Sequence, residues 1–326
     1  MKRFQNEALL SALKGANSVF LCTHIAPDGD AIGSMLAAGR TLRRMGKQAV
    51  MCCADSIPEK FLFLPGAREI RKPEGLDPDA FDLAFSLDAA DLGRIGRCAE
   101  VYERIPLRIQ IDHHGTNPAY ADQNEIDAAA AAAGCIVMRL LRALDIPVDR
   151  ETAECLYTAI STDTGNFCFS CADREVFEIM AELLDAGIEL APLARQLHLM
   201  REKEYLGLLG RALGSMRFLM DGQVTVTKLT PEDYAAVQAR PEHADGIVNY
   251  GLYIPGVRIT CFADGRLPGE TKLSLRAMPP YSAADIAVRL GGGGHVAAAG
   301  CRVEKPLDEA IELVLQAIRE EMERHS

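Results

Sequence analysis

The sequence of 326 residues contains no tryptophan, and only 6% of its residues are aromatic. Proteins that hold long single strands stack bases on aromatic side chains, so this composition argues against that class. Basic residues are also in deficit, because 35 Lys and Arg stand against 46 Asp and Glu and give a net charge of −11. Long nucleic acid is held by a basic surface that neutralises phosphates. We therefore expect no long duplex partner, although a local basic pocket would still accept a small anion.

Long apolar runs are missing as well. The N-terminus lacks the uninterrupted apolar region of a signal peptide, and no stretch approaches the roughly 18 apolar residues of a membrane span. The 10 cysteines are irregularly spaced, and the C-x-x-C motif at Cys168 and Cys171 has no second pair that would complete a zinc site. A thioredoxin-like role is disfavoured because the motif does not open a helix after a strand. We expect reduced, mostly buried thiols in a cytoplasmic protein with no membrane partner.

The pattern of apolar segments predicts an α/β domain in the first half of the chain. The runs expected to be buried strands lie at 18–22, 48–53, 81–87 and 107–111. The stretches with helical periodicity lie at 1–13, 31–45, 135–144, 152–161 and 175–186. Strands that alternate with helices favour a mainly parallel, doubly wound sheet covered on both faces.

The pattern changes near residue 190, where a second, smaller α+β domain is predicted. Hairpin signals at Asp221-Gly222 and Asp264-Gly265 indicate antiparallel strands. The predicted helices of this part lie at 192–213, 282–290 and 307–324. We therefore predict three parts: an α/β domain at 1–188, a helical connector at 189–214 and an α+β domain at 215–326.

Polar side chains gather where the predicted parallel strands end, which is where such sheets bind ligands. They are His24, Asp28 and Asp30 after the first strand, Asp88 after the third, Asp112, His113 and His114 after the fourth, and Asp163 after a helix. Buried carboxylates that converge are costly unless cations neutralise them. A mixed imidazole and carboxylate set suits a divalent cation such as Mn²⁺. Taken singly, D-G-D also fits a turn with a helix cap, and paired histidines also fit a surface or core position.

A run of four glycines, 291–294, precedes His295 in the predicted second domain. Consecutive glycines let backbone amides approach a phosphate closely. Arg276, on a predicted strand, would supply a matching guanidinium. The alternatives are a flexible linker for the glycines and a solvated strand face for the arginine.

The chain carries, in order, T-H-I-A-P-D-G-D-A-I-G-S, S-L-D, D-H-H, D-T-G and G-G-G-G-H. This ordered set resembles the DHH phosphoesterase superfamily with its C-terminal DHH-associated domain, and the resemblance spans nearly the whole chain. The superfamily includes RecJ-type exonucleases, family II pyrophosphatases, cyclic-di-AMP phosphodiesterases and the nanoRNase/pAp phosphatase group. The length and the absence of extra domains make the chain most similar to the last group.

The resemblance implies a role for each of these residues. Metal ligands would be His24, Asp28 and Asp88 for one Mn²⁺ and Asp30, Asp88, His113 and Asp163 for the other, with Asp88 bridging; Mg²⁺ or Co²⁺ would be substitutes. His114 would face the scissile phosphate, and Asp112 would orient a histidine. The implied substrate-binding residues, in a cleft between the domains, are Arg276, Gly293, Gly294 and His295. One departure is Cys135, which stands where relatives often have an acidic residue and weakens the inference about substrate.

The implied activity is Mn²⁺-dependent hydrolysis by a hydroxide activated between two cations. Short oligoribonucleotides would be cut to nucleoside monophosphates, and 3'-phosphoadenosine 5'-phosphate (pAp) would be converted to AMP. A pApA or cyclic-di-AMP phosphodiesterase is the alternative with the same chemistry, and a catalytically silent nucleotide-binding module is the alternative from another class. The expected partners are short RNA, pAp and pApA, with a homodimer as a candidate assembly.

Overall fold

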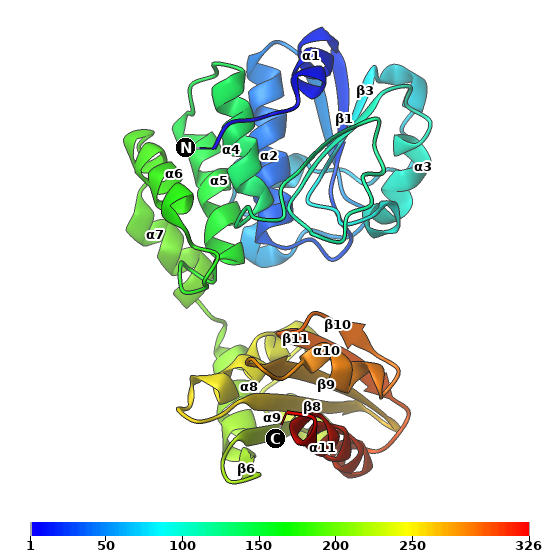
Figure 1. Ribbon diagram of the computed structural model, residues 1–326, viewed down its shortest axis with the longest axis vertical. Helices are drawn as coiled ribbons and strands as arrows, with labels where there is room; N and C mark the ends of the chain where they lie inside the picture. Colours follow the sequence, from blue (N-terminus) through cyan, green and yellow to red (C-terminus); the bar gives the residue numbers. More distant parts are fainter. Residues whose placement is uncertain (1, 326) are drawn as a thin grey trace. The chain divides into compact units, whose positions relative to one another are not determined.

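The computed structural model describes residues 2–325 and divides into two compact units, Met1–Met200 and Arg201–Ser326 (Figure 1). The first unit is built on a five-stranded, all-parallel sheet. In spatial order the strands are β2 (Gln48–Cys52), β1 (Ser18–Cys22), β3 (Leu83–Leu87), β4 (Arg108–Asp112) and β5 (Gln123–Ile126). The parallel α/β prediction is confirmed. Only β5 was not predicted, because its residues are mostly polar.

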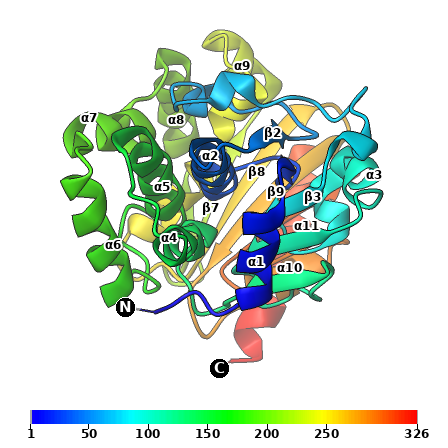
Figure 2. The same cartoon turned by 90° about the horizontal axis from the view of Figure 1, so that it is seen from above.

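Helices cover both faces of this sheet, and alternate strand residues face opposite layers. The α-helices are α1 (Glu7–Gly15), α2 (Gly29–Arg44), α3 (Ala99–Tyr102), α4 (Ala133–Ala143), α5 (Arg150–Asp163), α6 (Arg174–Asp185) and α7 (Leu190–Ala194). Leu21 and Phe85 pack with α1, α2, α4 and α5, whereas Phe20 and Ala84 pack with residues of α3. Figure 2 shows α4 and α5 on one side of the strands and α3 on the other. No helix within residues 2–325 is long and apolar enough to cross a membrane.

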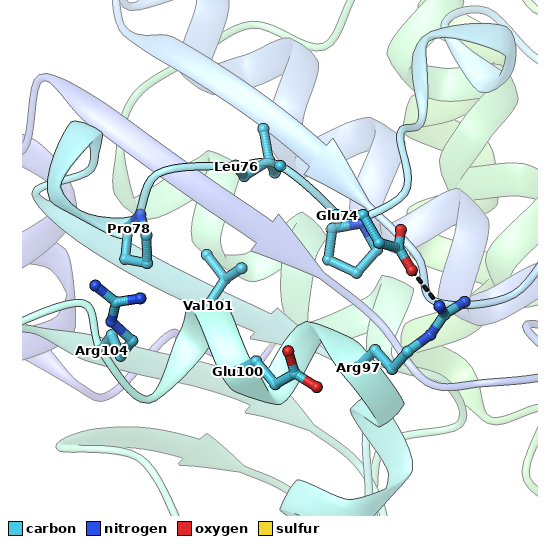
Figure 3. Close-up of a pocket in the computed structure, with 9 residues that line it drawn as sticks. Glu74, Leu76, Pro78, Arg97, Glu100, Val101 and Arg104 are labelled. Carbon is cyan, nitrogen blue, oxygen red and sulfur yellow. Dashed lines mark ion pairs between the residues drawn. The ribbon is translucent and has the colours of Figure 1, made fainter.

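Short helical turns complete the first unit. They are the 3-10 turns η1 (Glu59–Phe61), η2 (Ala67–Glu69), η3 (Pro78–Ala80) and η4 (Leu92–Cys98) and the π-helical turn η5 (Arg195–Leu199). A pocket of about 150 Å³ lies against η4 and α3, and in it Arg97 pairs with Glu74 (Figure 3). This pocket contains none of the predicted site residues.

Helices α2 and α5 pack closely because α2 carries a glycine at the contact. A Cβ atom added to Gly33 would lie 2.4 Å from the carbonyl oxygen of Cys155 and 2.8 Å from the amide nitrogen of Ala159, both on α5. Asp28 caps α2 by accepting a hydrogen bond from the amide of Ala31 at 3.1 Å. The close packing holds the first turn of α2 in place against α5.

The second unit contains a six-stranded mixed sheet. In spatial order its strands are β10 (Gly293–Gly294), β11 (Ala298–Val303), β9 (Glu270–Ala277), β8 (Ile259–Leu267), β7 (Val224–Leu229) and β6 (Arg217–Leu219). Helices α10 (Ala283–Val288) and α11 (Leu307–Glu323) pack on one face of this sheet. The remaining helical elements are α8 (Lys203–Gly214), α9 (Pro231–Ala236), η6 (Pro241–Ala244) and η7 (Ile247–Tyr253).

Two expectations for this unit were wrong in detail. The sheet is not wholly antiparallel, because β7 and β8 run parallel. Strand β8 also continues through Asp264-Gly265, and the chain turns at Pro268-Gly269 instead. Gly269 has a φ of 76°, so proline followed by a left-handed glycine makes the turn, as a type II turn requires. The Asp221-Gly222 turn does join β6 to β7.

The α2–α5 contact predicts that Gly33→Ala destabilises the first unit. Alanine is the better helix former by about 1 kcal/mol, but its methyl group would meet backbone atoms that cannot move aside, at an overpacking cost of about 1–3 kcal/mol. We expect a lower Tm in thermal unfolding followed by circular dichroism. Gly210→Ala on α8 is the control, because a Cβ there meets nothing within 4 Å and should leave Tm equal or raised. Equal stability of both variants would contradict the packing.

Candidate metal centre

The carboxyl edge of the first sheet brings together all the acidic and histidine residues that the sequence singled out in this unit. His24 follows β1, Asp88 follows β3, and His113 follows β4. The helices add Asp28 and Asp30 from the start of α2 and Asp163 from the end of α5. Asp112 is the last residue of β4, and His114 follows two residues later. The parallel topology therefore gathers residues that are far apart in the sequence.

A first group of candidate ligands consists of His24, Asp28 and Asp88, whose ligand atoms lie within 4.8 Å of one another. The Nε2 atom of His24 is 3.7 Å from Asp28 Oδ1 and 3.7 Å from Asp88 Oδ2. Donor atoms bound to one cation at about 2.0–2.2 Å are separated by roughly 3–4 Å. These separations therefore match three ligands of one cation.

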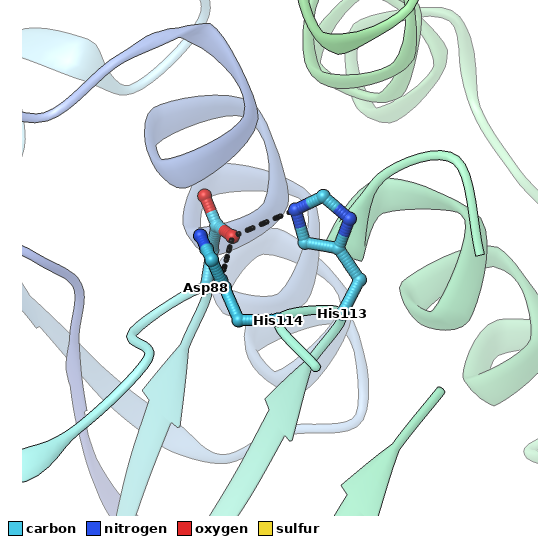
Figure 4. Close-up of side chains that lie close together, drawn as sticks. All are labelled: Asp88, His113 and His114. Atoms are coloured by element: carbon cyan, nitrogen blue, oxygen red, sulfur yellow. Dashed lines mark ion pairs between the residues drawn. The ribbon is translucent and has the colours of Figure 1, made fainter. Parts of the chain in front are cut away.

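A second group consists of Asp30, His113 and Asp163. The Nε2 atom of His113 is 3.8 Å from Asp30 Oδ2 and 3.3 Å from Asp163 Oδ2. The same nitrogen is 3.5 Å from Asp88 Oδ1 (Figure 4). One oxygen of Asp88 thus faces the first group and the other faces the second, which is the geometry of a carboxylate that bridges two cations.

Asp88 itself lacks the partners that a buried carboxylate needs. Its exposed fraction is 1%, and its Oδ1 atom is buried with no hydrogen-bond donor. Its backbone is left-handed, with a φ of 53°. A buried carboxylate oxygen without a partner lowers the stability of the fold by roughly several kcal/mol, unless a cation or a hydrogen-bond donor stabilises its charge. The residues present therefore fit a divalent cation on both sides of Asp88.

Both candidate histidine ligands are oriented by backbone carbonyls. The Nδ1 atom of His24 lies 2.8 Å from the carbonyl oxygen of Ile25, and that of His113 lies 3.3 Å from the carbonyl oxygen of Ala130. A proton on Nδ1 would donate to the carbonyl and leave the Nε2 lone pair facing the carboxylates. Metal-binding histidines are commonly oriented in this way.

Asp30 is held rigidly at the start of α2. Its carboxylate accepts hydrogen bonds from Ser34 Oγ at 2.8 Å, from the amide of Gly134 at 2.9 Å and from the amide of Ala133 at 2.5 Å. These amides belong to the first turn of α4. The thiol of Cys135, one position further on, is buried, and burial followed by the charge of Asp30 raises its pKa. Cysteine at this position therefore adds no charge to the cluster.

The pKa values of these carboxyl groups are shifted because the groups are buried and lie close together. Burial, followed by the charges of Asp88 and Asp163, raises the pKa of Asp30 well above its usual range. Burial and the charges of Asp88 and Asp28 raise the pKa of Asp163 to about 8. Burial alone would lower the pKa of His24, but its contacts with Asp28 and Asp88 raise it to about 10. All three shifts favour extra protons, and bound cations would replace those protons.

Asp112 contacts histidine and amide groups. It belongs neither to the two groups above nor to the third group of candidate ligands, which is Asp88, His113 and His114. Its Oδ1 atom accepts from the amide of His113 at 2.8 Å and lies 2.8 Å from His114 Nδ1. Its Oδ2 atom accepts from Asn117 Nδ2 at 2.5 Å. Burial would raise the pKa of Asp112, but the bonds to His114 and Asn117 lower it. Asp112 thus stays ionised, raises the pKa of His114 and fixes that ring.

Asn117 was missed in the sequence, although it lies only three residues after His114. Its amide nitrogen also bonds the carbonyl oxygen of Ala89 at 3.1 Å and Gln110 Oε1 at 3.0 Å. Ala89 follows Asp88 directly, so Asn117 ties the loop after β3 to the loop after β4. The spacing D-H-H-x-x-N was the available signal, but a single asparagine in a Gly- and Pro-containing loop also fits an ordinary turn.

The second unit brings its own candidates together at one end of its sheet. Arg276 on β9 is in register with Ala298 on β11, and Gly294 pairs with the next residue of β11. His295 and Ala298 exchange backbone hydrogen bonds of 2.7 and 3.1 Å and close a tight turn. Gly293, Gly294 and His295 are exposed, and Arg276 is half-buried, with its pKa lowered by burial. Their nucleotide-binding role stays a prediction.

Most cysteines are buried, as expected, and all ten are free. Cys168 and Cys171 are the exposed ones and lie in the turn after α5. Neither belongs to a group of candidate metal ligands among the described residues. The C-x-x-C motif therefore stays outside the candidate centre.

Comparison with known proteins gives matches in both units. Residues 18–160 match the DHH family, N-terminal domain, and residues 221–324 match the DHHA1 domain. The chain is 39% identical over 322 residues to the bifunctional oligoribonuclease and PAP phosphatase NrnA of Thermus thermophilus, covering 97% of this chain and 93% of that protein. It is 23% identical over 309 residues to the probable bifunctional oligoribonuclease and PAP phosphatase NrnA of Streptococcus mutans. That match covers 90% of this chain and 92% of that protein.

Among solved structures, the chain is similar to an exopolyphosphatase-related protein from Bacteroides fragilis. The TM-score is 0.91 at 26% sequence identity, and the match covers 96% of this chain and 95% of that one. The similarity in fold therefore extends over nearly the whole length of both chains.

The pKa shifts predict how the stability of chelated protein depends on pH. Folding raises the pKa of the Asp163 carboxyl group from 3.8 to about 8. It raises the pKa of the His24 imidazole from 6.5 to about 10. In both cases the folded state binds more protons, so the stabilisation is complete below the unfolded pKa and is lost as pH rises through the folded pKa. We expect the Tm of chelated protein to fall between about pH 6 and pH 9.

Added Mn²⁺ should remove much of this fall, because cations replace the protons. The Tm difference between loaded and chelated protein should therefore grow with pH in differential scanning calorimetry. Asp163→Asn is the matched variant and should flatten the curve of the chelated form. A rising Tm of chelated parent across this range would contradict the proposed charge balance.

Proposed function

The chain belongs to the DHH family of phosphoesterases and carries a DHHA1 domain, and on that premise we propose that it hydrolyses short oligoribonucleotides and pAp. The products would be nucleoside monophosphates from RNA and AMP from pAp. The substrate assignment is supported by the 39% identity, over 97% of the chain, to an enzyme named as an oligoribonuclease and PAP phosphatase. The reaction class is supported by one observation above all, the two oxygens of buried Asp88 that face separate ligand groups.

The cofactor would be a pair of divalent cations, Mn²⁺ in preference to Mg²⁺ or Co²⁺. Mixed imidazole and carboxylate donors suit Mn²⁺, whereas Mg²⁺ prefers oxygen and keeps its waters. The proposed ligands are His24, Asp28 and Asp88 for one ion and Asp30, Asp88, His113 and Asp163 for the other. When bound, such a pair lowers the pKa of water and offsets charge on a phosphoryl group.

The protein's own groups would supply positioning and a proton. His114 donates its Nδ1 proton to Asp112, which leaves the opposite edge of the ring available to the phosphate. A charged His114 would stabilise negative charge on the phosphoryl oxygens or protonate the leaving oxygen. Asn117 keeps Asp112 in place through its 2.5 Å bond. In the second unit Arg276 and the turn at Gly294 and His295 would bind another phosphate of the nucleotide.

The proposed function is tested by one parallel assay. Purified protein with Mn²⁺ is incubated with pAp, pApA, a short RNA and pyrophosphate, and the products are separated by chromatography. We expect AMP from pAp and nucleoside monophosphates from RNA, and full loss of both after chelation. Preferential cleavage of pApA would reassign the substrate within the same chemistry. Full turnover in chelated protein, or turnover of pyrophosphate alone, would contradict the proposal.

The proposed role of the second unit predicts that Arg276→Ala and His295→Ala keep the metal content of the parent. They should raise KM for pAp by roughly 5–150-fold, which corresponds to a lost charge-assisted contact of about 1–3 kcal/mol. A fall in kcat would accompany this if the binding energy positions the ester. Steady-state kinetics and metal analysis provide the measurement.

Bis-p-nitrophenyl phosphate separates binding from chemistry, because this small ester has no second phosphate to hold. Its hydrolysis should change little in either variant. Arg302→Ala is the matched control, since Arg302 lies on the same sheet and pairs with Glu270 on the surface. Equal losses on pAp and the small ester would mean that these residues act at the chemical step.

A further inference from the structure

Arg94 lies beside the first group of candidate ligands, although no sequence motif drew attention to it. It belongs to η4, whose start is capped by Asp91 through a 3.0 Å bond from the amide of Arg94. The carbonyl oxygen of Arg94 accepts a 2.7 Å hydrogen bond from the amide of Ile25. This bond fixes η4 to the loop that carries His24 and sets one guanidinium nitrogen 3.3 Å from His24 Nδ1.

The position of the proton on the His24 ring determines whether this contact is a hydrogen bond. His24 directs Nε2 at Asp28 and Asp88, so it binds a cation there only if Nε2 is unprotonated. The proton then resides on Nδ1, which donates to the carbonyl oxygen of Ile25 at 2.8 Å. Protonated Nδ1 has no lone pair for a second donor. The guanidinium of Arg94 is therefore a neighbour of His24 and not its hydrogen-bond partner in the metal-binding state.

Arg94 is also unused as an ion-pair partner. It is exposed, and within residues 2–325 no carboxylate oxygen lies within 4.0 Å of its guanidinium, although several carboxylates form the nearby cluster. Arg97, three residues later and beyond the kink at Gly96, shows the contrast. It pairs with Glu74 across the pocket beside η4 (Figure 3). Of these two arginines on η4, Arg94 is the one whose donors remain available to an external anion.

We propose that Arg94 binds a phosphate oxygen of the substrate on the His24 side of the centre. The ligand class is a phosphate monoester or diester anion, and the inference rests on the proposed function for its physiological substrate. A guanidinium presents two parallel N–H donors that match two oxygens of a phosphate. Arg94 adds a positive charge beside carboxylates that would otherwise repel the anion. Arg94 lies in η4, six residues after Asp88 in the chain.

The test uses Arg94→Gln, which removes the charge but keeps a polar side chain of similar length. Inorganic phosphate is titrated calorimetrically into Mn²⁺-loaded protein, and bound metal is counted by atomic emission. We expect the metal content of the parent and phosphate binding that is at least about tenfold weaker, as for a lost charge-assisted bond. Arg97→Gln, three residues along η4, should match the parent in both measurements.

The competing role for Arg94 is to hold His24 by donating to Nδ1. In that case Arg94→Gln would lose metal while its phosphate affinity returned to the parental value in excess Mn²⁺, and the proposal would be overturned. Unchanged phosphate affinity, or a loaded parent that binds no phosphate, would also overturn it. Weaker phosphate binding in Arg94→Gln, with a parent that cleaves none of the nucleotides, would sustain Arg94 as an anion-binding residue and reject the proposed substrates instead.

Discussion

Mutual repulsion among buried carboxylates at one edge of the first sheet is the constraint on which the rest of this unit depends. Asp30 is fully buried and Asp88 nearly so. Asp163 lies close enough for its charge to repel the charges of both. Water does not reach Asp30 and Asp88, so the fold must compensate their charges from within. Backbone amides at the start of α4 compensate Asp30, but Asp88 Oδ1 has no donor at all. Divalent cations would complete the compensation, and metal binding would then contribute to the stability of the fold.

The architecture around the cluster serves this arrangement. Parallel strands end at a common edge, so one topological rule gathers His24, Asp88 and His113 from separate segments. The close approach of α2 and α5 at Gly33 holds Asp30 and Asp163 near each other from the helical side. Carbonyl groups behind the histidines direct their Nε2 atoms inward. Each element thus orients one or two candidate ligands, and small changes in packing would change the geometry of the centre.

The sequence predicted the parallel sheet and the convergence of its polar residues because both follow from periodicity and a topological rule. It did not predict β5, whose residues Gln123, Asn124 and Glu125 carry no apolar pattern and pair at a sheet edge. The turn at Pro268-Gly269 was misplaced because Asp264-Gly265 is an equally ordinary turn signal. Asn117 and Arg94 were missed for a different reason. Asn117 bonds the carbonyl oxygen of Ala89, 28 residues earlier, and Arg94 lies against His24, 70 residues earlier, so the fold and not the local sequence creates these contacts.

The bridging position of Asp88 is the central claim, and electron paramagnetic resonance tests it most directly. Chelated protein is titrated with Mn²⁺, and the spectrum is recorded at low temperature after each addition. Two cations that share a carboxylate about 4 Å apart are magnetically coupled. The prediction is a broad coupled spectrum as the second equivalent binds, and its loss in Asp88→Asn. A parent that saturates at one equivalent, or that keeps the sharp hyperfine pattern of isolated Mn²⁺ throughout, would contradict the two-cation centre.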